Sequence, residues 1–175
     1  MNPMKKILFI LFISLAIAQD LNADFLKSEL NRAIDDINSK KFSSAISRID
    51  NNDFSQSIFS NHALILKMKA LHGNGDIENA LLVRKSINLN NLESNLNTIY
   101  SIEMGDIFSE MGFFDKSFEY YLIANKNNID SKSNKRINQR IKRMVRMELD
   151  EQHIGSLLLT EDDPMSINVL RFVQS

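Results

Sequence analysis

The sequence has 175 residues, which is enough for one compact domain or a short array of structural repeats. Hydrophobic residues make up 43% of it and charged residues 25%, the balance of a folded soluble protein. The absence of cysteine excludes a disulfide framework, thiolate metal ligands and the acylated cysteine of a bacterial lipoprotein. Only five glycines and two prolines occur, which favours helices joined by short loops over an all-β fold.

The first 18 residues have the pattern of a cleavable signal peptide. Lys5 and Lys6 precede an uncharged segment over residues 7–18, which ends in the small-x-small motif Ala16-Ile17-Ala18. This segment is much shorter than the roughly 20 residues of a spanning helix, so an uncleaved anchor is the weaker alternative. We therefore expect a periplasmic or secreted protein that does not span the membrane after cleavage. Without the two lysines the net charge of −1 becomes −3, and we expect no nucleic-acid partner.

From residue 24 onward, apolar residues recur at helical spacing. Asp24 is the expected N-cap of a first helix whose apolar stripe reaches Ile37. Further helices are expected over residues 42–49, 54–72, 77–87, 92–111, 114–126 and 133–149, with weaker segments over 152–159 and from residue 164 to the end. The alternation of long and short helices with tight turns predicts an all-α series of helical hairpins rather than a bundle of equal helices.

The second helix of each expected hairpin begins with the same pattern, which is a turn residue, a bulky apolar residue, two polar residues and a small one. The pattern occurs at Lys40-Lys41-Phe42-Ser43-Ser44-Ala45, at Gly75-Asp76-Ile77-Glu78-Asn79-Ala80 and at Gly112-Phe113-Phe114-Asp115-Lys116-Ser117. The small residues recur at a spacing close to the roughly 34 residues of a tetratricopeptide repeat.

The third copy, residues 98–129, resembles the tetratricopeptide repeat at several positions together. Gly105 stands where the first helix needs a small residue, and Phe108 follows at the usual aromatic position. Gly112 ends that helix, and Tyr121 and Ala124 occupy the aromatic and small positions of the second helix. The resemblance implies an α-solenoid of tandem antiparallel helix pairs. The alternative is an unrelated helical bundle with accidental spacing.

The two earlier copies depart from the repeat pattern. Met68 and Arg84 replace the small and the aromatic residue of the middle copy, and Asp36 stands at the aromatic position of the first. We expect about three repeats over residues 19–131 and a further helical hairpin over 132–175, comprising a degenerate fourth repeat and the truncated start of the next. The apolar face continues to Ser175 without a stop signal, which motivates the alternative that the chain is the helical N-terminal part of a longer protein.

The resemblance also implies a binding groove lined by the first helix of each pair. The residues carried over to it are His62, Ile65, Lys69 and His72 in the middle copy, and Ile99, Ile102, Asp106, Ser109 and Glu110 in the third. Alternatively, the three isoleucines are simply core. A second candidate is a basic surface at Lys135, Arg136, Arg140 and Arg143, suited to an acidic protein, an anionic lipid head group or a cell-wall polymer. A solvated helix face is the more common meaning of such a charge run.

No pattern of catalytic residues occurs in the sequence, and we expect neither an enzyme nor a cofactor. His62 and His72 lie nearly three turns apart on one expected helix, too far to share a metal ion. The sequence therefore predicts an extracytoplasmic scaffold or adaptor that binds a protein or peptide in a cell-envelope complex. The alternatives are a helical module of a longer exported protein and a carrier of a small ligand or metal.

Overall fold

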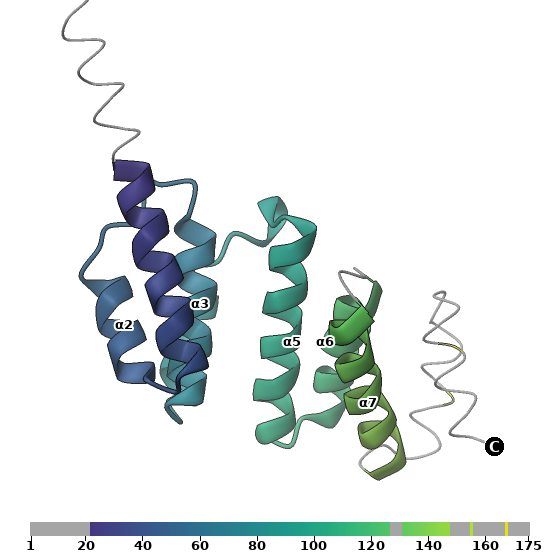
Figure 1. Ribbon diagram of the computed structural model, residues 1–175. Helices are drawn as coiled ribbons and strands as arrows, with labels where there is room; N and C mark the ends of the chain where they lie inside the picture. Colours follow the sequence, from purple (N-terminus) through teal and green to yellow (C-terminus); the bar gives the residue numbers. More distant parts are fainter. Residues whose placement is uncertain (1–21, 127–130, 148–154, 156–166, 168–175) are drawn as a thin grey trace, which may run out of the picture. The chain divides into compact units, whose positions relative to one another are not determined.

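The structure is a computed structural model that describes residues 22–126, 131–147, 155 and 167. Within these residues the chain forms helices and turns and no strand, which confirms the predicted all-α class (Figure 1). None of the described helices is both long and apolar enough to cross a membrane. The predicted signal peptide over residues 1–18 lies outside the described residues. So do the expected helices over 152–159 and 164–175, apart from Gly155 and Ile167.

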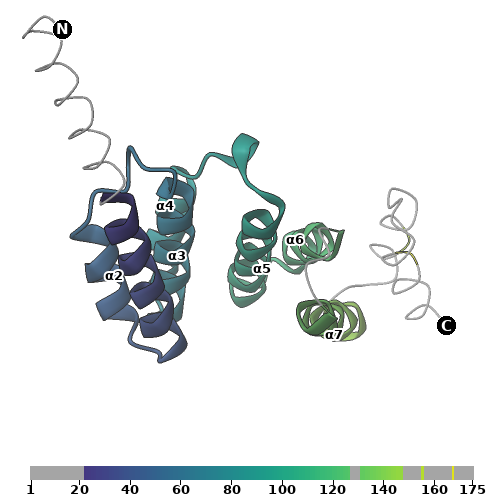
Figure 2. The same cartoon turned by 45° about the horizontal axis from the view of Figure 1, so that its top comes forward.

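The chain divides into two compact units between Ile87 and Asn88. The first unit contains a helix over residues 22–38, then α2 (Phe42–Asp50), α3 (Ser60–Gly73) and α4 (Ile77–Arg84). Helix α3 packs against both α2 and α4 (Figure 2). One core cluster joins the 22–38 helix, α2 and α3, and it includes Leu30, Ala33, Ile49 and Ala63.

The second unit contains a short 3-10 helix η1 (Leu89–Asn91), followed by α5 (Ser94–Glu110), α6 (Phe114–Lys126) and α7 (Ser131–Met147). Helix α6 packs against both α5 and α7. The side chains of Phe118 and Leu122 on α6 share a buried cluster with Ile137 and Ile141 on α7. The central helix therefore fixes the two that flank it.

Three hairpin turns share one backbone geometry. Lys40, Gly75 and Gly112 each have a positive φ, of 58°, 81° and 78° respectively. The amide of the next residue donates back five positions in each case, from Lys41, Asp76 and Phe113, at 2.8, 2.9 and 2.8 Å. This is the Schellman arrangement, in which a left-handed residue ends one helix and reverses the chain. The recurring turn residues of the sequence thus mark real and equivalent turns.

The small residue of each recurring pattern lies at a fully buried point of its hairpin. Ala45, Ala80 and Ser117 are each 0% exposed. The backbone amide of each donates a hydrogen bond to the carbonyl four residues earlier, at 3.0 to 3.1 Å. A larger side chain at these positions would separate the paired helices, because interiors are packed without spare volume.

Two predicted helix boundaries are wrong by three residues or more, and the predicted N-cap of the first helix is wrong as well. The third helix begins at Ser60 rather than residue 54, because the Asp53 carboxylate accepts hydrogen bonds from the amide and hydroxyl of Ser55, at 2.9 and 2.6 Å, and holds a local turn. The fourth helix ends at Arg84, and residues 85–87 continue as tight turns. Asp24 lies inside the first helix, which already includes residue 22, and is not its N-cap.

Candidate protein-binding surface

One side of α5 carries the residues predicted to line a groove in the third copy. Ile99, Ile102, Asp106 and Glu110 are spaced three or four residues apart, so they follow one stripe along the helix. Ile99 is 41% exposed and Glu110 is exposed, whereas Ile102 is half-buried against the α6–α7 core. Ser109 is also half-buried. The stripe therefore offers one apolar contact and one acidic contact at the surface.

Asp106 is the centre of a polar cluster that joins three helices. The Tyr121 hydroxyl on α6 donates to Asp106 Oδ1 at 2.5 Å. The Arg140 guanidinium on α7 donates to Asp106 Oδ2 at 2.9 Å. We refer to Asp106, Tyr121 and Arg140 as the Asp106 cluster. Because both carboxylate oxygens are engaged, Asp106 fixes the positions of α5, α6 and α7 relative to one another.

The absence of a side chain at Gly105 allows the Tyr121 ring to reach Asp106. A Cβ atom at Gly105 would lie 2.5 Å from Tyr121 Cε1, well inside the normal carbon contact of about 3.5–4.0 Å. Next to this contact, the buried Ser117 hydroxyl donates to the Gly105 carbonyl at 2.6 Å. The Arg140 guanidinium lies 5.7 Å from the centre of the Tyr121 ring, within cation–π range. Burial, and then the hydrogen bond to the Asp106 carboxylate, raise the pKa of the Tyr121 hydroxyl far above its ordinary value.

The candidate basic surface lies on the exposed side of α7. Lys135, Arg140 and Arg143 are exposed, whereas the side chain of Arg136 lies outside the described part of the chain. Because Arg140 bonds to Asp106, the basic surface and the α5 stripe meet at one ion pair. The sequence did not predict this connection, since the residues lie on different helices and no local spacing links them.

The candidate residues of the middle copy lie on α3 in the first unit. Ile65 is 1% exposed and belongs to the core, as the alternative interpretation held. His62, Lys69 and His72 are all half-buried. The His62 and Phe59 rings lie nearly perpendicular with their centres 6.1 Å apart, and the Nδ1 atom of His62 is buried without a hydrogen-bond partner. No cluster of three or more potential metal ligands occurs among the described residues.

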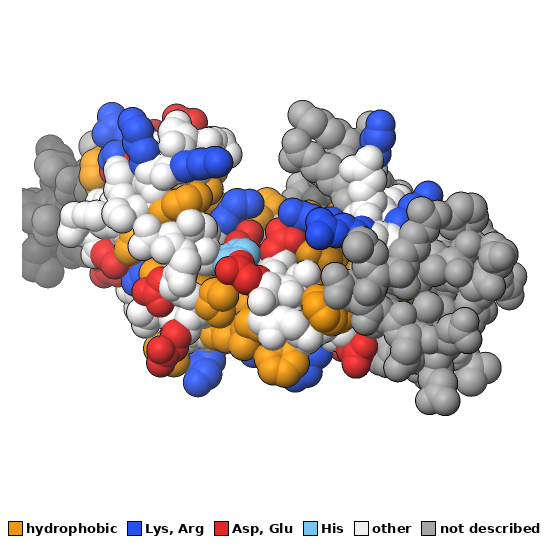
Figure 3. All heavy atoms as spheres, turned by 90° about the horizontal axis from the view of Figure 1, so that it is seen from below, with side chains coloured by type: hydrophobic (Ala, Val, Ile, Leu, Met, Phe, Trp, Pro, Cys, Tyr) orange, Lys and Arg blue, Asp and Glu red, His pale blue; other side chains and the backbone are white. Residues whose placement is uncertain are grey.

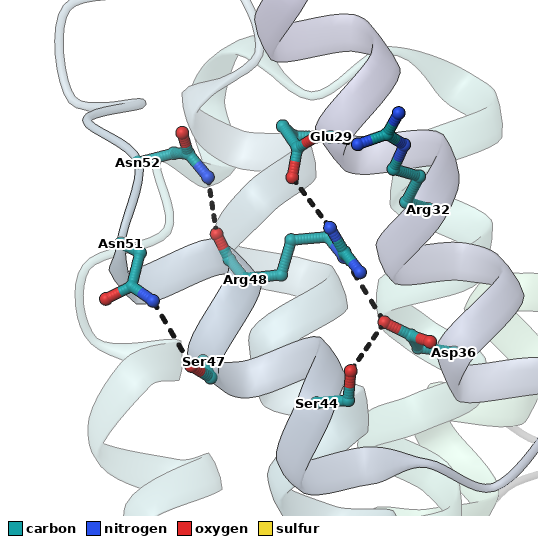
Figure 4. A network of polar contacts seen from close by, with 8 residues as sticks. All are labelled: Glu29, Arg32, Asp36, Ser44, Ser47, Arg48, Asn51 and Asn52. Carbon is teal, nitrogen blue, oxygen red and sulfur yellow. Dashed lines mark hydrogen bonds and ion pairs between the residues drawn. The ribbon is translucent and has the colours of Figure 1, made fainter.

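A second polar network connects the 22–38 helix to α2, and the sequence analysis missed it (Figure 4). Arg48 on α2 bonds to Glu29 at 2.9 Å and to Asp36 at 3.2 Å. The Ser44 hydroxyl donates to the same Asp36 oxygen at 2.9 Å. The hydrogen bond from Ser44, followed by the Arg48 guanidinium, lowers the pKa of the Asp36 carboxyl. Desolvation acts in the opposite direction. Asp36 therefore joins the 22–38 helix to α2 through an ion pair and a hydrogen bond.

Aromatic rings form a continuous row between α5 and α6. Phe108 stacks on Tyr120 with ring centres 5.5 Å apart, and Phe108 and Phe113 pack edge to face with centres 6.3 Å apart. Tyr120 in turn meets Tyr100 at 6.1 Å, and the Lys116 ammonium lies 5.6 Å from the Phe108 ring. Phe113 is 52% exposed, so the row reaches the surface at one end. Figure 3 shows apolar side chains among charged ones on the face that it presents.

Compared with known proteins, the chain matches no family model, no curated protein and no solved structure.

Proposed function

We propose that the protein is an extracytoplasmic scaffold of tetratricopeptide-like helix pairs, which binds a protein or peptide through the exposed stripe of α5. The signal-peptide pattern of residues 1–18 supports export. Three equivalent Schellman turns and three fully buried small residues support a repeated hairpin. The absence of a metal-ligand cluster among the described residues gives no reason to prefer a metal carrier.

The Asp106 cluster is the observation that carries the proposal. It ties α5 to α6 and α7 through two bonds to one carboxylate, so the helix that carries Ile99 and Glu110 is held in place before any partner arrives. Binding to a rigid surface avoids the entropic cost of ordering that surface. An exposed isoleucine with an acidic side chain on the same stripe provides an apolar contact and a polar one that fixes orientation.

Asp106 itself is a poor position at which to test binding, because its substitution would also break the contacts among three helices. Ile99→Glu is a better variant, since that side chain is 41% exposed. Ile123→Glu on α6 provides a matched control, because Ile123 is 42% exposed in the same unit and carries the same change in charge and polarity.

The test is a crosslinking pull-down of the tagged, full-length protein from its native envelope fraction. We expect one defined partner, recovered with the wild-type protein and with Ile123→Glu but lost with Ile99→Glu. Equal far-UV circular dichroism of the two variants establishes that both are folded. Retention of the same partner by Ile99→Glu, or equal loss in both variants, would contradict binding through the α5 stripe.

A further inference from the structure

Helix α7 carries a high positive charge that the proposed scaffold function does not require. Its residues include Lys132, Lys135, Arg136, Arg140, Lys142, Arg143 and Arg146, and no aspartate or glutamate. The preceding hairpin of α5 and α6 is rich in acids, so the positive charge is concentrated on one helix rather than spread over the unit. Such a concentration creates a local field that the nearly neutral whole chain does not have.

The basic residues and the apolar residues of α7 occupy opposite sides of the helix. Ile137 and Ile141 are 0% exposed and Met144 is 4% exposed, and all three belong to the core shared with α6. Among the α7 side chains that the structure describes, those that are exposed are Lys135, Gln139, Arg140, Lys142 and Arg143. At about 100° per residue, the four cations span roughly 160° of the helix circumference. We refer to these four cations as the basic face of α7.

The chemistry of the basic face limits which partner it fits. The centres of stable protein–protein interfaces contain apolar or aromatic anchors, often together with arginine, and are depleted in lysine. The described residues exposed on this side of α7 are all lysine, arginine or glutamine, so no apolar or aromatic anchor is present among them. A membrane surface with anionic head groups requires no pocket and no anchor, because it attracts cations through its surface potential.

We propose that the basic face of α7 binds the anionic head groups of a lipid bilayer. The apolar stripe of the helix is buried against α6, so α7 lies on the surface rather than inserting into it. Arg140 already bonds to Asp106, so Lys135 and Arg143 contribute more of the attraction. This contact would hold the scaffold against a membrane while the α5 stripe binds its partner. The inference concerns a different surface and does not depend on the proposed function.

Flotation with vesicles tests the proposal on the full-length chain. Vesicles that contain phosphatidylglycerol are compared with vesicles of phosphatidylcholine alone, at low and high salt. The apolar segment over residues 7–18 is common to all samples, so the difference between the two lipids reports the electrostatic contribution. We expect the wild-type protein to favour the anionic vesicles and to lose that preference at high salt, because exposed charges are screened.

Two matched double variants separate the position of the charge from its amount. Lys135→Gln/Arg143→Gln removes two cations from the basic face, and Lys27→Gln/Lys85→Gln removes two exposed lysines from the first unit. Each cation close to an anionic surface strengthens binding about fivefold, so the first variant should bind about 30-fold more weakly. The control should keep most of its binding.

Three results would overturn the proposal. Equal binding to anionic and neutral vesicles would exclude head-group recognition. Equal losses in both double variants would mean that net charge, rather than the basic face, governs binding. Salt-sensitive binding to polyglutamate, without any preference for anionic vesicles, would assign the face to an acidic protein instead. None of these results depends on whether Ile99→Glu loses its partner, so the two proposals can fail separately.

Discussion

Replacement of Gly105 by alanine tests whether the Asp106 cluster is as tightly packed as its distances indicate. The new methyl group would lie 2.5, 2.6 and 3.0 Å from the Cε1, Cδ1 and Cζ atoms of Tyr121. The ring is 3% exposed, so it has little free space to move into. Its hydroxyl is also held by Asp106 and its face is covered by Arg140, so movement of the ring disturbs both contacts.

The expected loss of stability for Gly105→Ala combines three effects. Overpacking of a well-packed core costs about 1–3 kcal/mol, and the fixed ring places this site near 3. Alanine in place of glycine inside a helix returns about 1 kcal/mol. If the ring shifts, it also gives up a hydrogen bond to a carboxylate, which contributes about 1.5 kcal/mol. We therefore expect the free energy of unfolding to fall by about 2 to 3.5 kcal/mol.

Tyrosine fluorescence during urea unfolding measures this loss in the second unit alone. The chain has no tryptophan, and its three tyrosines are Tyr100, Tyr120 and Tyr121, all beyond the boundary at Ile87. The signal therefore reports unfolding of the α5–α7 unit without a contribution from the first. A lower transition midpoint at unchanged slope would show that stability fell without a change in the surface exposed on unfolding.

A second-site variant identifies the cause of the loss. In the Tyr121→Leu background the ring is absent, so adding Gly105→Ala should be neutral or stabilising by up to about 1 kcal/mol. Gly73→Ala, followed by far-UV circular dichroism because the first unit has no tyrosine, is a comparison in which the new methyl group meets the ring of Phe42, which is only half-buried. If Gly105→Ala leaves the wild-type midpoint unchanged, the Tyr121 ring does not approach α5 as closely as these distances indicate.

Three further predictions concern single residues. Lys40 has a φ of 58°, so Lys40→Gly should raise stability by about 0.5–1 kcal/mol, measured by far-UV circular dichroism in urea. Asp36 has a pKa below its usual 3.8, so its stabilising effect is complete above that value and is lost as the pH falls through the lowered pKa. Asp36→Asn should thus weaken the acid dependence of unfolding more than Asp35→Asn, an exposed control on the same helix. Arg140→Gln should lower stability by about 1 kcal/mol, because a half-exposed ion pair with Asp106 and a ring contact are lost, and tyrosine fluorescence measures it. An unchanged midpoint would contradict the prediction for Arg140→Gln, and a loss of stability would contradict the one for Lys40→Gly. Equal acid dependence of Asp36→Asn and Asp35→Asn would contradict the third.

The hairpins could be predicted from the sequence because their signals are local. A residue able to adopt a positive φ, followed five positions later by a small residue, specifies both the turn and the closest contact of the helix pair. Gly75 and Gly112 fit this rule by residue type, whereas Lys40 fits it only through its position in the repeated pattern. The start of α3 could not be predicted, since Phe54 is 6% exposed and fills the core from a turn, where helical periodicity does not apply.

The polar contacts between helices could not be predicted, because their partners are distant in sequence. Asp106 lies 15 residues from Tyr121, and nothing in a helical periodicity indicates that the two side chains meet. Arg48 and Asp36 are likewise 12 residues apart on different helices. In the sequence, Asp36 was only a departure from the repeat pattern. Position within a pattern thus indicates where a residue lies, whereas its partner depends on how the helices pack.

The basic residues of α7 divide into two roles according to what surrounds them. Arg140 is held by Asp106 and by the Tyr121 ring, so its charge is already balanced and its side chain is fixed. Lys135 and Arg143 are exposed on the same helix, where their charges face solvent. Loss of Arg140 should therefore affect folding more than vesicle binding, and loss of the other two should do the reverse. If all three substitutions weakened vesicle binding equally, the ion pair with Asp106 would not hold in solution.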